Sequence, residues 1–591
     1  MWRSQGKPKQ GFTLLEMKKS RSYFKFVLRK CKQDVSKLTA DSLANKLLCK
    51  NDNVFWKEVK KMNQCNVPVV STIDGVTGVN NINNMWQQHY KSLLNSSKDT
   101  SSKEYVVKHV SEVDNGCFYF ERFTVDDVKE SFKNIKNGKT CGLDGIYGEH
   151  LKHAHSKIHV LLSLLFNVIT IHGHMPLNLM DTLIVPMVKD KKGNLTDKDN
   201  YRPLAITCIV SKVFEVLILT RYHDTFKTSD NQFGFKDKMS TELCIYTLKQ
   251  VTEYYVQHDS AMYICFLDAS KAFDKINHWL LFRKLIDRHV PSIIVRILMV
   301  WYVRQNFYVR WSNSTSSSFT VTNGVRQGGI LSPYLFNLYI DDLSVKLNNV
   351  STGCIFNGGR INHLFYADDA VLLAPSPHAM QQLLNVCDDF ACEQELIYNV
   401  KKTFCVCVRP KWLKNITIPN MFLSGNIVNI TSNHKYLGMY IMDSLNDEMD
   451  MKRQLRSIYA RGNVLIKQFR QCSEDVKIKL FKAYCSSFYC LALWNRFTVA
   501  NYKKVKSSYN RIFRNFLQVD RDSMSLTMVL NNVKSFQEIE RNLIYGLKCR
   551  LLMSDNQLVC VLVDSLFFNS SKLTTGCFNK NVPIQILGIT Q

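Results

Sequence analysis

Residues 364–374 read Leu-Phe-Tyr-Ala-Asp-Asp-Ala-Val-Leu-Leu-Ala, a pattern that predicts two short apolar strands joined by an acidic turn. The adjacent carboxylates of Asp368 and Asp369 repel each other at such a turn, and a bound cation would explain the pair. An ion that prefers oxygen ligands, such as Mg²⁺, fits it. The alternative is an ordinary Asp-rich hairpin turn without a ligand. These residues alone do not decide between the two interpretations.

A second acidic motif lies earlier in the chain. Residues 266–274 read Phe-Leu-Asp-Ala-Ser-Lys-Ala-Phe-Asp, and Asp268 ends an apolar strand predicted over residues 261–267. Two strands that each deliver a carboxylate can pair side by side and hold two divalent ions, the arrangement used for nucleotidyl transfer. The alternative is that Asp268 caps the following helix and that Asp274 is simply solvated.

A third motif, Asn-Gly-Val-Arg-Gln-Gly-Gly-Ile-Leu-Ser-Pro, occupies residues 323–333. Gly328 and Gly329 allow the backbone to approach a ligand closely. Gln327 offers an amide, and Ser332 with Pro333 predicts the N-cap and first residue of a helix that runs to about residue 347. Taken alone, this motif is a loop before a helix.

The rest of the central region alternates β-type and helical patterns, which predicts mixed α and β structure. A strand is expected over residues 182–188 and a helix after Ser376. Thr124 and Asp127 predict a capping box at another helix start. The Ser-rich residues 92–104 are expected to form a loop.

The chain of 591 residues has 77 Lys and Arg against 50 Asp and Glu, a formal net charge of +27. A folded chain this basic is expected to bind a polyanion. Residues 1–61 and 449–520 are both basic and helical in pattern. Aromatic residues lie between the basic ones in the second segment: Tyr459, Phe469, Phe481, Tyr484 and Phe513. They indicate either contact with nucleic acid or the core of a helical bundle with a solvated basic face.

Membrane association is not expected, because the longest apolar run, residues 158–171, is too short to span a bilayer. The 19 cysteines are irregularly spaced, which favours reduced thiols and an intracellular protein, in the cytoplasm, the nucleus or both.

The three motifs, in this order, resemble the palm of a reverse transcriptase, and specifically the non-LTR (LINE-type) retrotransposon family. The resemblance implies an α+β right-hand polymerase with fingers, a palm built on an antiparallel sheet, and a helical thumb. It also implies RNA-directed DNA polymerase activity on dNTPs, with an RNA template and a DNA primer or target as partners. Further blocks resemble the same family: residues 138–146, 186–189, 200–204, 211–215, 232–235, 399–403 and 435–438.

The resemblance also implies roles for single residues. Asp268 and Asp368 would be catalytic ligands of two Mg²⁺ ions, supported by Asp369, with Mn²⁺ as an alternative metal. Phe273 would be the steric gate that rejects a 2′-hydroxyl, and Lys402 would protonate the leaving pyrophosphate. The remaining nucleotide-binding residues would be Lys189, Arg202, Gln327 and Gly328.

The implied domains are a basic N-terminal extension (1–122), fingers and palm (123–445), a helical thumb (446–530) and a tail of unknown role (531–591). The segment before the first block is shorter than the endonuclease that relatives commonly carry, so a truncated element product is expected. Two alternatives remain. One is an element-derived RNA-binding protein with an inactive palm, and the less favoured one is a group II intron maturase.

Overall fold

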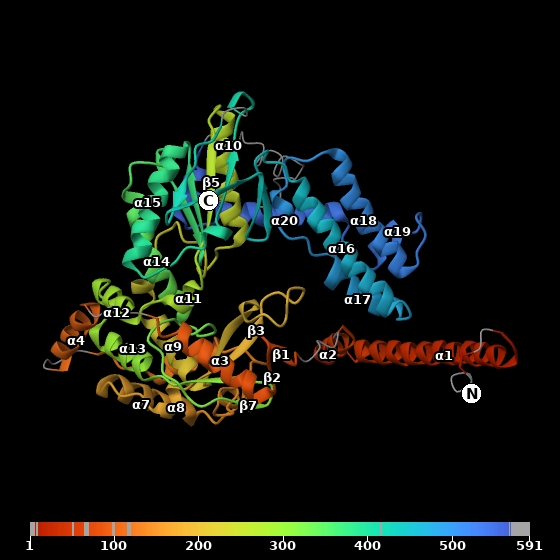
Figure 1. Ribbon diagram of the computed structural model, residues 1–591, viewed down its shortest axis with the longest axis horizontal. Coiled ribbons are helices and arrows are strands. Elements are labelled where there is room, and N and C mark those ends of the chain that lie inside the picture. Colours follow the sequence, from red (N-terminus) through yellow and green to blue (C-terminus); the bar gives the residue numbers. More distant parts are fainter. Residues whose placement is uncertain are drawn as a thin grey trace, which may run out of the picture. The chain divides into compact units, whose positions relative to one another are not determined.

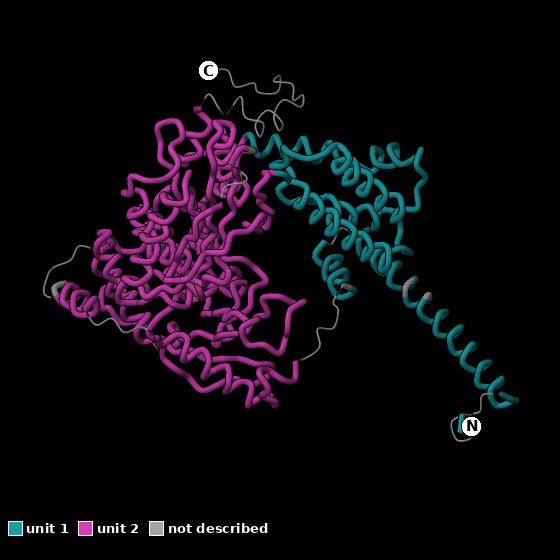
Figure 2. The backbone as a smooth tube through the Cα atoms, turned by 45° about the horizontal axis from the view of Figure 1, so that its top comes forward, with its two compact units in different colours: residues 1–68, 446–548, 576–591 teal, residues 69–445, 549–575 magenta. Residues whose placement is uncertain are grey.

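The computed structural model describes residues 6–7, 10–49, 52–63, 70–96, 101–114, 120–413, 417–565 and 568. These residues divide into two compact units (Figure 2). One contains the described residues within 1–68 and 446–548, and the other those within 69–445 and 549–575.

The larger unit is built around a five-stranded sheet with the strand order β10-β11-β5-β12-β15. β5 lies at its centre and pairs antiparallel with β11 and with β12. The expected antiparallel sheet is present, except that β15 runs parallel to β12. Helix α15 covers one face and α10 the other, with α14 packed beside α15 (Figure 1). The bounds are β5 (Met262–Asp268), β10 (His363–Tyr366), β11 (Asp369–Ala374), β12 (Phe404–Val408), β15 (Asn429–Thr431), α10 (Thr241–Gln257), α14 (Ser332–Asn349) and α15 (Pro377–Glu393).

A second sheet in this unit has the order β4-β3-β6-β7. Its strand β3 has the bounds predicted for it, and it forms an antiparallel hairpin with β4. Helix α3 packs on this sheet through Trp86, which is fully buried and has its ring centroid 5.1 Å from that of Tyr201. The bounds are α3 (Val79–Leu93), β3 (Thr182–Val188), β4 (Tyr201–Thr207), β6 (Phe307–Trp311) and β7 (Ser314–Thr315).

Further helices and short strands complete the larger unit. Its other helices are α4 (Ser101–Asp114), α5 (Val125–Lys133), α6 (Gly148–Lys152), α7 (Lys157–His172), α8 (Leu177–Met180), α9 (Ile209–Arg221), α11 (Ala272–Lys275), α12 (His278–Asp287), α13 (Ser292–Arg304) and α21 (Gln557–Val563). Its 3-10 turns are η1 (Lys198–Asn200), η2 (His223–Phe226), η3 (Val400–Lys402) and η4 (Lys411–Leu413). Its short strands are β1 (Thr72–Ile73), β2 (Val76–Thr77), β8 (Cys354–Phe356), β9 (Gly359–Ile361), β13 (Phe422–Leu423), β14 (Asn426–Ile427), β16 (Asn433–Tyr436) and β17 (Met439–Met442).

The smaller unit is helical in its described residues. Its elements are α1 (Phe12–Leu48), α2 (Asp52–Asn63), α16 (Glu448–Phe469), α17 (Glu474–Cys485), η5 (Leu491–Leu493), α18 (Val499–Leu517), α19 (Met524–Leu530) and most of α20 (Phe536–Leu552). Phe469, Phe481 and Phe513 are completely buried, and the rings of Phe481 and Phe513 meet edge to face. These three aromatic residues therefore form core, as the helical-bundle interpretation predicts.

Two predicted helix caps are present: Thr124 with Asp127 at α5, and Ser376 at α15. The predicted start of α14 is wrong by one residue, because Leu331 is its N-cap. The buried carboxylate of Glu215 accepts hydrogen bonds from the Ile330 and Leu331 N–H groups, which extends the helical backbone to this point. The bounds of the Ser-rich loop expected over residues 92–104 are wrong at both ends, since α3 ends at Leu93 and α4 begins at Ser101. Residues 94–96 are not helical, and residues 97–100 lie outside the described residues.

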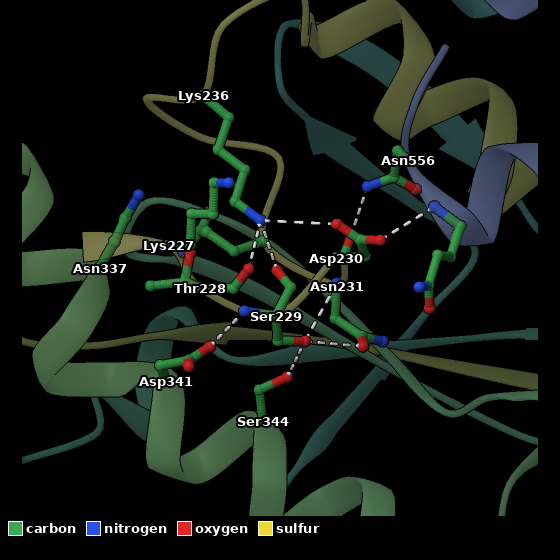
Figure 3. Close-up of polar contacts among 12 residues, drawn as sticks. Lys227, Thr228, Ser229, Asp230, Asn231, Lys236, Asn337, Asp341, Ser344 and Asn556 are labelled. Atoms are coloured by element: carbon green, nitrogen blue, oxygen red, sulfur yellow. Dashed lines mark hydrogen bonds and ion pairs between the residues drawn. The ribbon is translucent and has the colours of Figure 1, made fainter. Parts of the chain in front are cut away.

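The segment after α20 returns to the larger unit, where it docks on Asp230 (Figure 3). Asn556 Nδ2 donates to the Asp230 carbonyl at 2.8 Å, and the Gln557 N–H donates to its carboxylate at 2.9 Å. On the other side, Lys236 Nζ lies 3.8 Å from the same carboxylate. Helix α21 thus belongs to the larger unit through contacts that the sequence did not indicate.

Candidate active site

The two acidic motifs meet at one end of the five-stranded sheet. β10 and β11 form a hairpin in which Tyr366 is paired with Asp369, so Ala367 and Asp368 make the turn. Asp369 is directly opposite Asp268 of β5 in the antiparallel register. Residues paired in this way place their side chains on the same face of a sheet. Asp268 does not cap the next helix, because the N-cap of α11 is Lys271.

Burial raises the pKa values of the three carboxylates, and neighbouring carboxylates add to the shift at Asp368 and Asp369. Partial desolvation by the surrounding protein raises the pKa of Asp369 to about 6, and the charges of Asp368 and Asp268 add to the shift. Desolvation likewise raises the pKa of Asp368 and of Asp268. Lys402 and Lys189 oppose the shift at Asp268. Mutual repulsion of this kind is what a bound cation relieves.

The donor set fits a hard divalent cation. In the described part of the chain, no three His, Cys, Asp or Glu side chains are arranged to hold a metal ion by themselves. Mg²⁺ is usually held by one or two carboxylates together with water and substrate phosphates. Asp368 and Asp369 are solvent-accessible at the turn, so such a ligand can reach them.

Gln232 holds the turn that carries Asp368. Its Oε1 accepts hydrogen bonds from the Ala367 N–H at 2.9 Å and from the Gly234 N–H at 2.8 Å. Gly234 packs so closely on the turn that a Cβ there would lie 2.3 Å from the Ala367 nitrogen. In the sequence, residues 232–235 showed only a family resemblance. The one local sign of this contact was a glycine, Gly234, two residues after the amide side chain of Gln232. The buried Gln232 is thus a structural support of the acidic turn.

The loop over residues 323–332 is held by two acidic residues. Gln327 Nε2 donates to Asp274 Oδ1 at 2.6 Å, and Arg326 Nη2 donates to Glu215 Oε1 at 2.8 Å. Asp274 is 4% exposed, so its expected solvation is wrong. Burial raises the pKa of Asp274 to about 6, and the hydrogen bond from Gln327 opposes the shift. The sequence did not indicate that either carboxylate would bind this loop, because Glu215 and Asp274 come from distant segments.

The same loop contacts the hairpin of β3 and β4. The Ala205 N–H donates to the Gln327 carbonyl at 2.8 Å. Gly328 has a φ of 125°, and a Cβ there would lie 2.6 Å from the Ala205 carbonyl oxygen. Only glycine allows this close approach. The backbone around Gln327 is therefore held on both sides.

Phe273 lies beside this loop. Its ring stacks on that of Phe336 in α14, with centroids 4.0 Å apart and planes 7° apart. The ring of Phe235 meets it edge to face at 6.2 Å. The Phe273 carbonyl accepts a hydrogen bond from the Val325 N–H, which ties it to the loop. Its orientation is therefore determined by packing and by the backbone together.

The predicted basic residues lie around the carboxylates. Lys189 Nζ donates to the Asp199 carbonyl at 2.8 Å. Burial lowers the pKa of Lys189, and the positive charges of Lys271, Arg202 and Lys402 lower it further. Arg202 acts electrostatically on Asp368 as well. The structure thus brings all nine predicted site residues to one end of β5 and the loops beside it.

Comparison with known proteins agrees with this arrangement. Residues 189–441 match the family model described as reverse transcriptase (RNA-dependent DNA polymerase). The match spans less than half of the chain. The expected relationship to non-LTR retrotransposons is also confirmed, because the curated relatives of this domain come from such elements.

One relative is the RNA-directed DNA polymerase from mobile element jockey of Drosophila funebris. It is 25% identical, and the match covers 66% of this chain and 43% of the relative. A second is the Pol polyprotein of the type-2 retrotransposable element R2DM of Drosophila melanogaster. It is 26% identical, and the match covers 60% of this chain and 36% of the relative. The chain therefore spans less than half the length of these relatives.

A solved structure of apo telomerase from Candida Tropicalis, truncated from its C-terminal domain, has 12% sequence identity and a TM-score of 0.32. The match covers 49% of this chain and 59% of that one. Within the described part of the chain, no helix is both long enough and apolar enough to cross a bilayer.

Proposed function

We propose that this chain is an RNA-directed DNA polymerase that adds dNTPs to a primer 3′-hydroxyl by copying an RNA template. The register that places Asp369 opposite Asp268, with Asp368 at the adjoining turn, carries this proposal. Asp268 and Asp368 would hold two Mg²⁺ ions, with Asp369 in support. The ions would supply activation of the hydroxyl and stabilisation of the leaving pyrophosphate.

The other residues bind and orient the nucleotide. Lys189 and Arg202 would face the triphosphate, and the fixed fork of arginine suits phosphate oxygens. Gln327 and Gly328 would line the nucleotide pocket on a loop whose backbone is already held in place. Phe273, stacked on Phe336, would exclude a 2′-hydroxyl. Lys402 would give a proton to pyrophosphate.

The first test measures dTTP incorporation by the purified chain on poly(rA)/oligo(dT) with Mg²⁺. We expect incorporation by the wild type and none by the Asp368→Ala/Asp369→Ala variant. Asp389→Ala, which removes an exposed carboxylate from the outside of α15, is the matched control and should keep activity.

The opposite result would favour an RNA-binding protein with an unused palm. In that case the wild type would not incorporate dTTP under any metal condition, yet it would bind RNA in a salt-sensitive manner. The Asp368→Ala/Asp369→Ala variant would then bind RNA as the wild type does.

A further inference from the structure

Lys271 occupies an unusual position in the larger unit. It lies three residues after Asp268, in the turn between β5 and α11, and has a φ of 51°. Side chains other than those of glycine, asparagine and aspartate rarely adopt this left-handed conformation, and such residues cluster at functional sites. Neither of the proposed roles at this end of β5, metal binding or nucleotide selection, accounts for Lys271.

The ammonium groups of Lys271 and Lys189 both contact Asp199. Lys271 Nζ lies 3.4 Å from Asp199 Oδ1, while Lys189 Nζ donates to the Asp199 carbonyl at 2.8 Å. Asp199 belongs to η1 in the connection between β3 and β4, whereas Lys271 follows β5. Two basic side chains from different elements thus converge on one acidic residue.

This ion pair is accessible and therefore exchangeable. The side chain of Asp199 is 66% exposed and that of Lys271 is 36% exposed. Exposed pairs of this kind contribute little to stability, because water and salt screen them. A ligand with higher negative charge can displace the Asp199 carboxylate without disturbing the core.

The surrounding charge favours such a ligand. Lys271, Arg202 and Lys402 all act on Lys189, and Asp199 is the acidic residue that opposes them there. Lys189, Lys402 and Arg202 also act on the carboxylates of Asp268 and Asp368, whereas the Asp199 carboxylate is the one paired with Lys271. Such a group of cations suits an anion with several charges. On the proposed function, the triphosphate of the incoming dNTP is that anion.

We propose that Lys271 is a further ligand of the dNTP triphosphate, and that Asp199 binds its ammonium group until the nucleotide replaces the carboxylate. Asp199 is then a competitor of the substrate and not a support of Lys271. This distinction gives opposite signs for two substitutions. Removing Lys271 weakens dNTP binding, and neutralising Asp199 strengthens it.

The experiment measures dTTP binding to the protein on poly(rA)/oligo(dT) with Ca²⁺ and, separately, the KM and kcat for dTTP with Mg²⁺. We expect Lys271→Ala and Lys271→Gly to weaken binding and raise KM by about tenfold, as loss of one charge-assisted contact would do. Glycine relieves the backbone conformation while alanine does not, so equal effects assign the loss to the charge. Lys271→Arg should restore most of the affinity.

Asp199→Asn should lower the dissociation constant for dTTP by about threefold, and the Asp199→Asn/Lys271→Ala double variant should match Lys271→Ala. Lys275→Ala is the matched control. Lys275 follows in the same segment, but its Nζ donates to Ser96 Oγ at 2.9 Å, and its removal should leave dTTP affinity unchanged.

Two results would overturn the proposal: weaker dTTP binding in Asp199→Asn, or an effect of Lys271→Ala no larger than that of Lys275→Ala. Failure of the proposed function is separate from both. A wild type that binds dTTP through Lys271 but does not incorporate it would remove the polymerase proposal and leave this one standing.

Discussion

The larger unit has acidic side chains both in its interior and at its surface. The two kinds differ in their exposure and in their hydrogen-bond partners. Glu215 is 0% exposed and accepts hydrogen bonds from Arg326 and from the Ile330 and Leu331 N–H groups. The Arg326 guanidinium lies 4.1 Å from the ring centroid of Trp301. The Glu215 carboxylate is therefore buried, and both of its oxygens accept hydrogen bonds.

The carboxylates of Asp268, Asp368 and Asp369 have the opposite environment. They are accessible, they repel one another, and the pKa of Asp369 rises to about 6 as a result of desolvation and these charges. A paired buried acid stabilises the fold, whereas accessible acids without such partners are available to bind a cation. This difference is what the proposed function requires of the two kinds of acid.

The largest expected effect is on activity at the unpaired group. Asp369→Asn should reduce dTTP incorporation by at least about a thousandfold, an activation free energy of about 4 kcal/mol. The same variant should unfold at equal or higher denaturant concentration, because one of three repelling charges is gone. We expect a gain of about 1 kcal/mol after solvent screening is allowed for. Urea unfolding at pH 7 checks this sign, and a clear loss of stability would contradict the comparison.

At Glu215, substitutions of the carboxylate or of its partner Arg326 should change the stability of the protein. Arg326→Met keeps an unbranched side chain beside Trp301 but removes the guanidinium, so Glu215 is left charged, buried and without its partner. The free energy of unfolding should fall by about 3–5 kcal/mol. Glu215→Gln/Arg326→Met should recover part of that loss, because the unpaired charge is removed. A double variant less stable than Arg326→Met would show that the pair is not what stabilises this region.

The sequence predicted the accessible carboxylates of Asp268, Asp368 and Asp369 much better than the buried carboxylate of Glu215. Short apolar runs located β5, β10 and β11, and their acidic ends predicted which residues would meet. Nothing local indicated that Glu215 would pair with Arg326 or that Asp274 would bind Gln327, because these contacts join segments that only the tertiary fold brings together. The packing of Trp86 on β4 and the left-handed backbone of Lys271 were hidden for the same reason.

A smaller effect is expected where an uncharged side chain supports the acidic turn. Gln232→Leu removes the acceptor for the Ala367 and Gly234 N–H groups, so the turn loses its positioning but keeps its carboxylates. We expect kcat to fall by about 10- to 100-fold with little change in KM for dTTP. Gln381→Leu is the control, because Gln381 makes a similar two-way contact with Phe422 away from the site. Equal losses of kcat in both variants would refute a specific role for Gln232.

The smallest effect concerns pH, at two buried residues, His278 and Asp274, that form hydrogen bonds with the loop over residues 323–332. Burial lowers the pKa of His278 to about 4, against the favourable hydrogen bond to the Gly324 carbonyl. As pH falls, His278 therefore takes up a proton in the unfolded chain before it does so in the folded protein. Its contribution to stability is present above pH 6.5 and is lost as pH falls toward 4.

Asp274 has the opposite sign, because its pKa is raised to about 6. Its protonated form is favoured in the folded protein, so the penalty of burying its charge disappears as pH falls from 6 toward 3.8. The two groups partly cancel in the wild type, and single variants separate them. Between pH 7 and 6, protonation of His278 in the unfolded chain lowers the free energy of unfolding by about 0.7 kcal/mol, and His278→Gln should abolish this decrease. Asp274→Asn should make the remaining acid-induced loss steeper between pH 6 and 4, and urea unfolding across this range measures both. Parallel stability curves for the two variants would mean that neither side chain titrates as its burial requires.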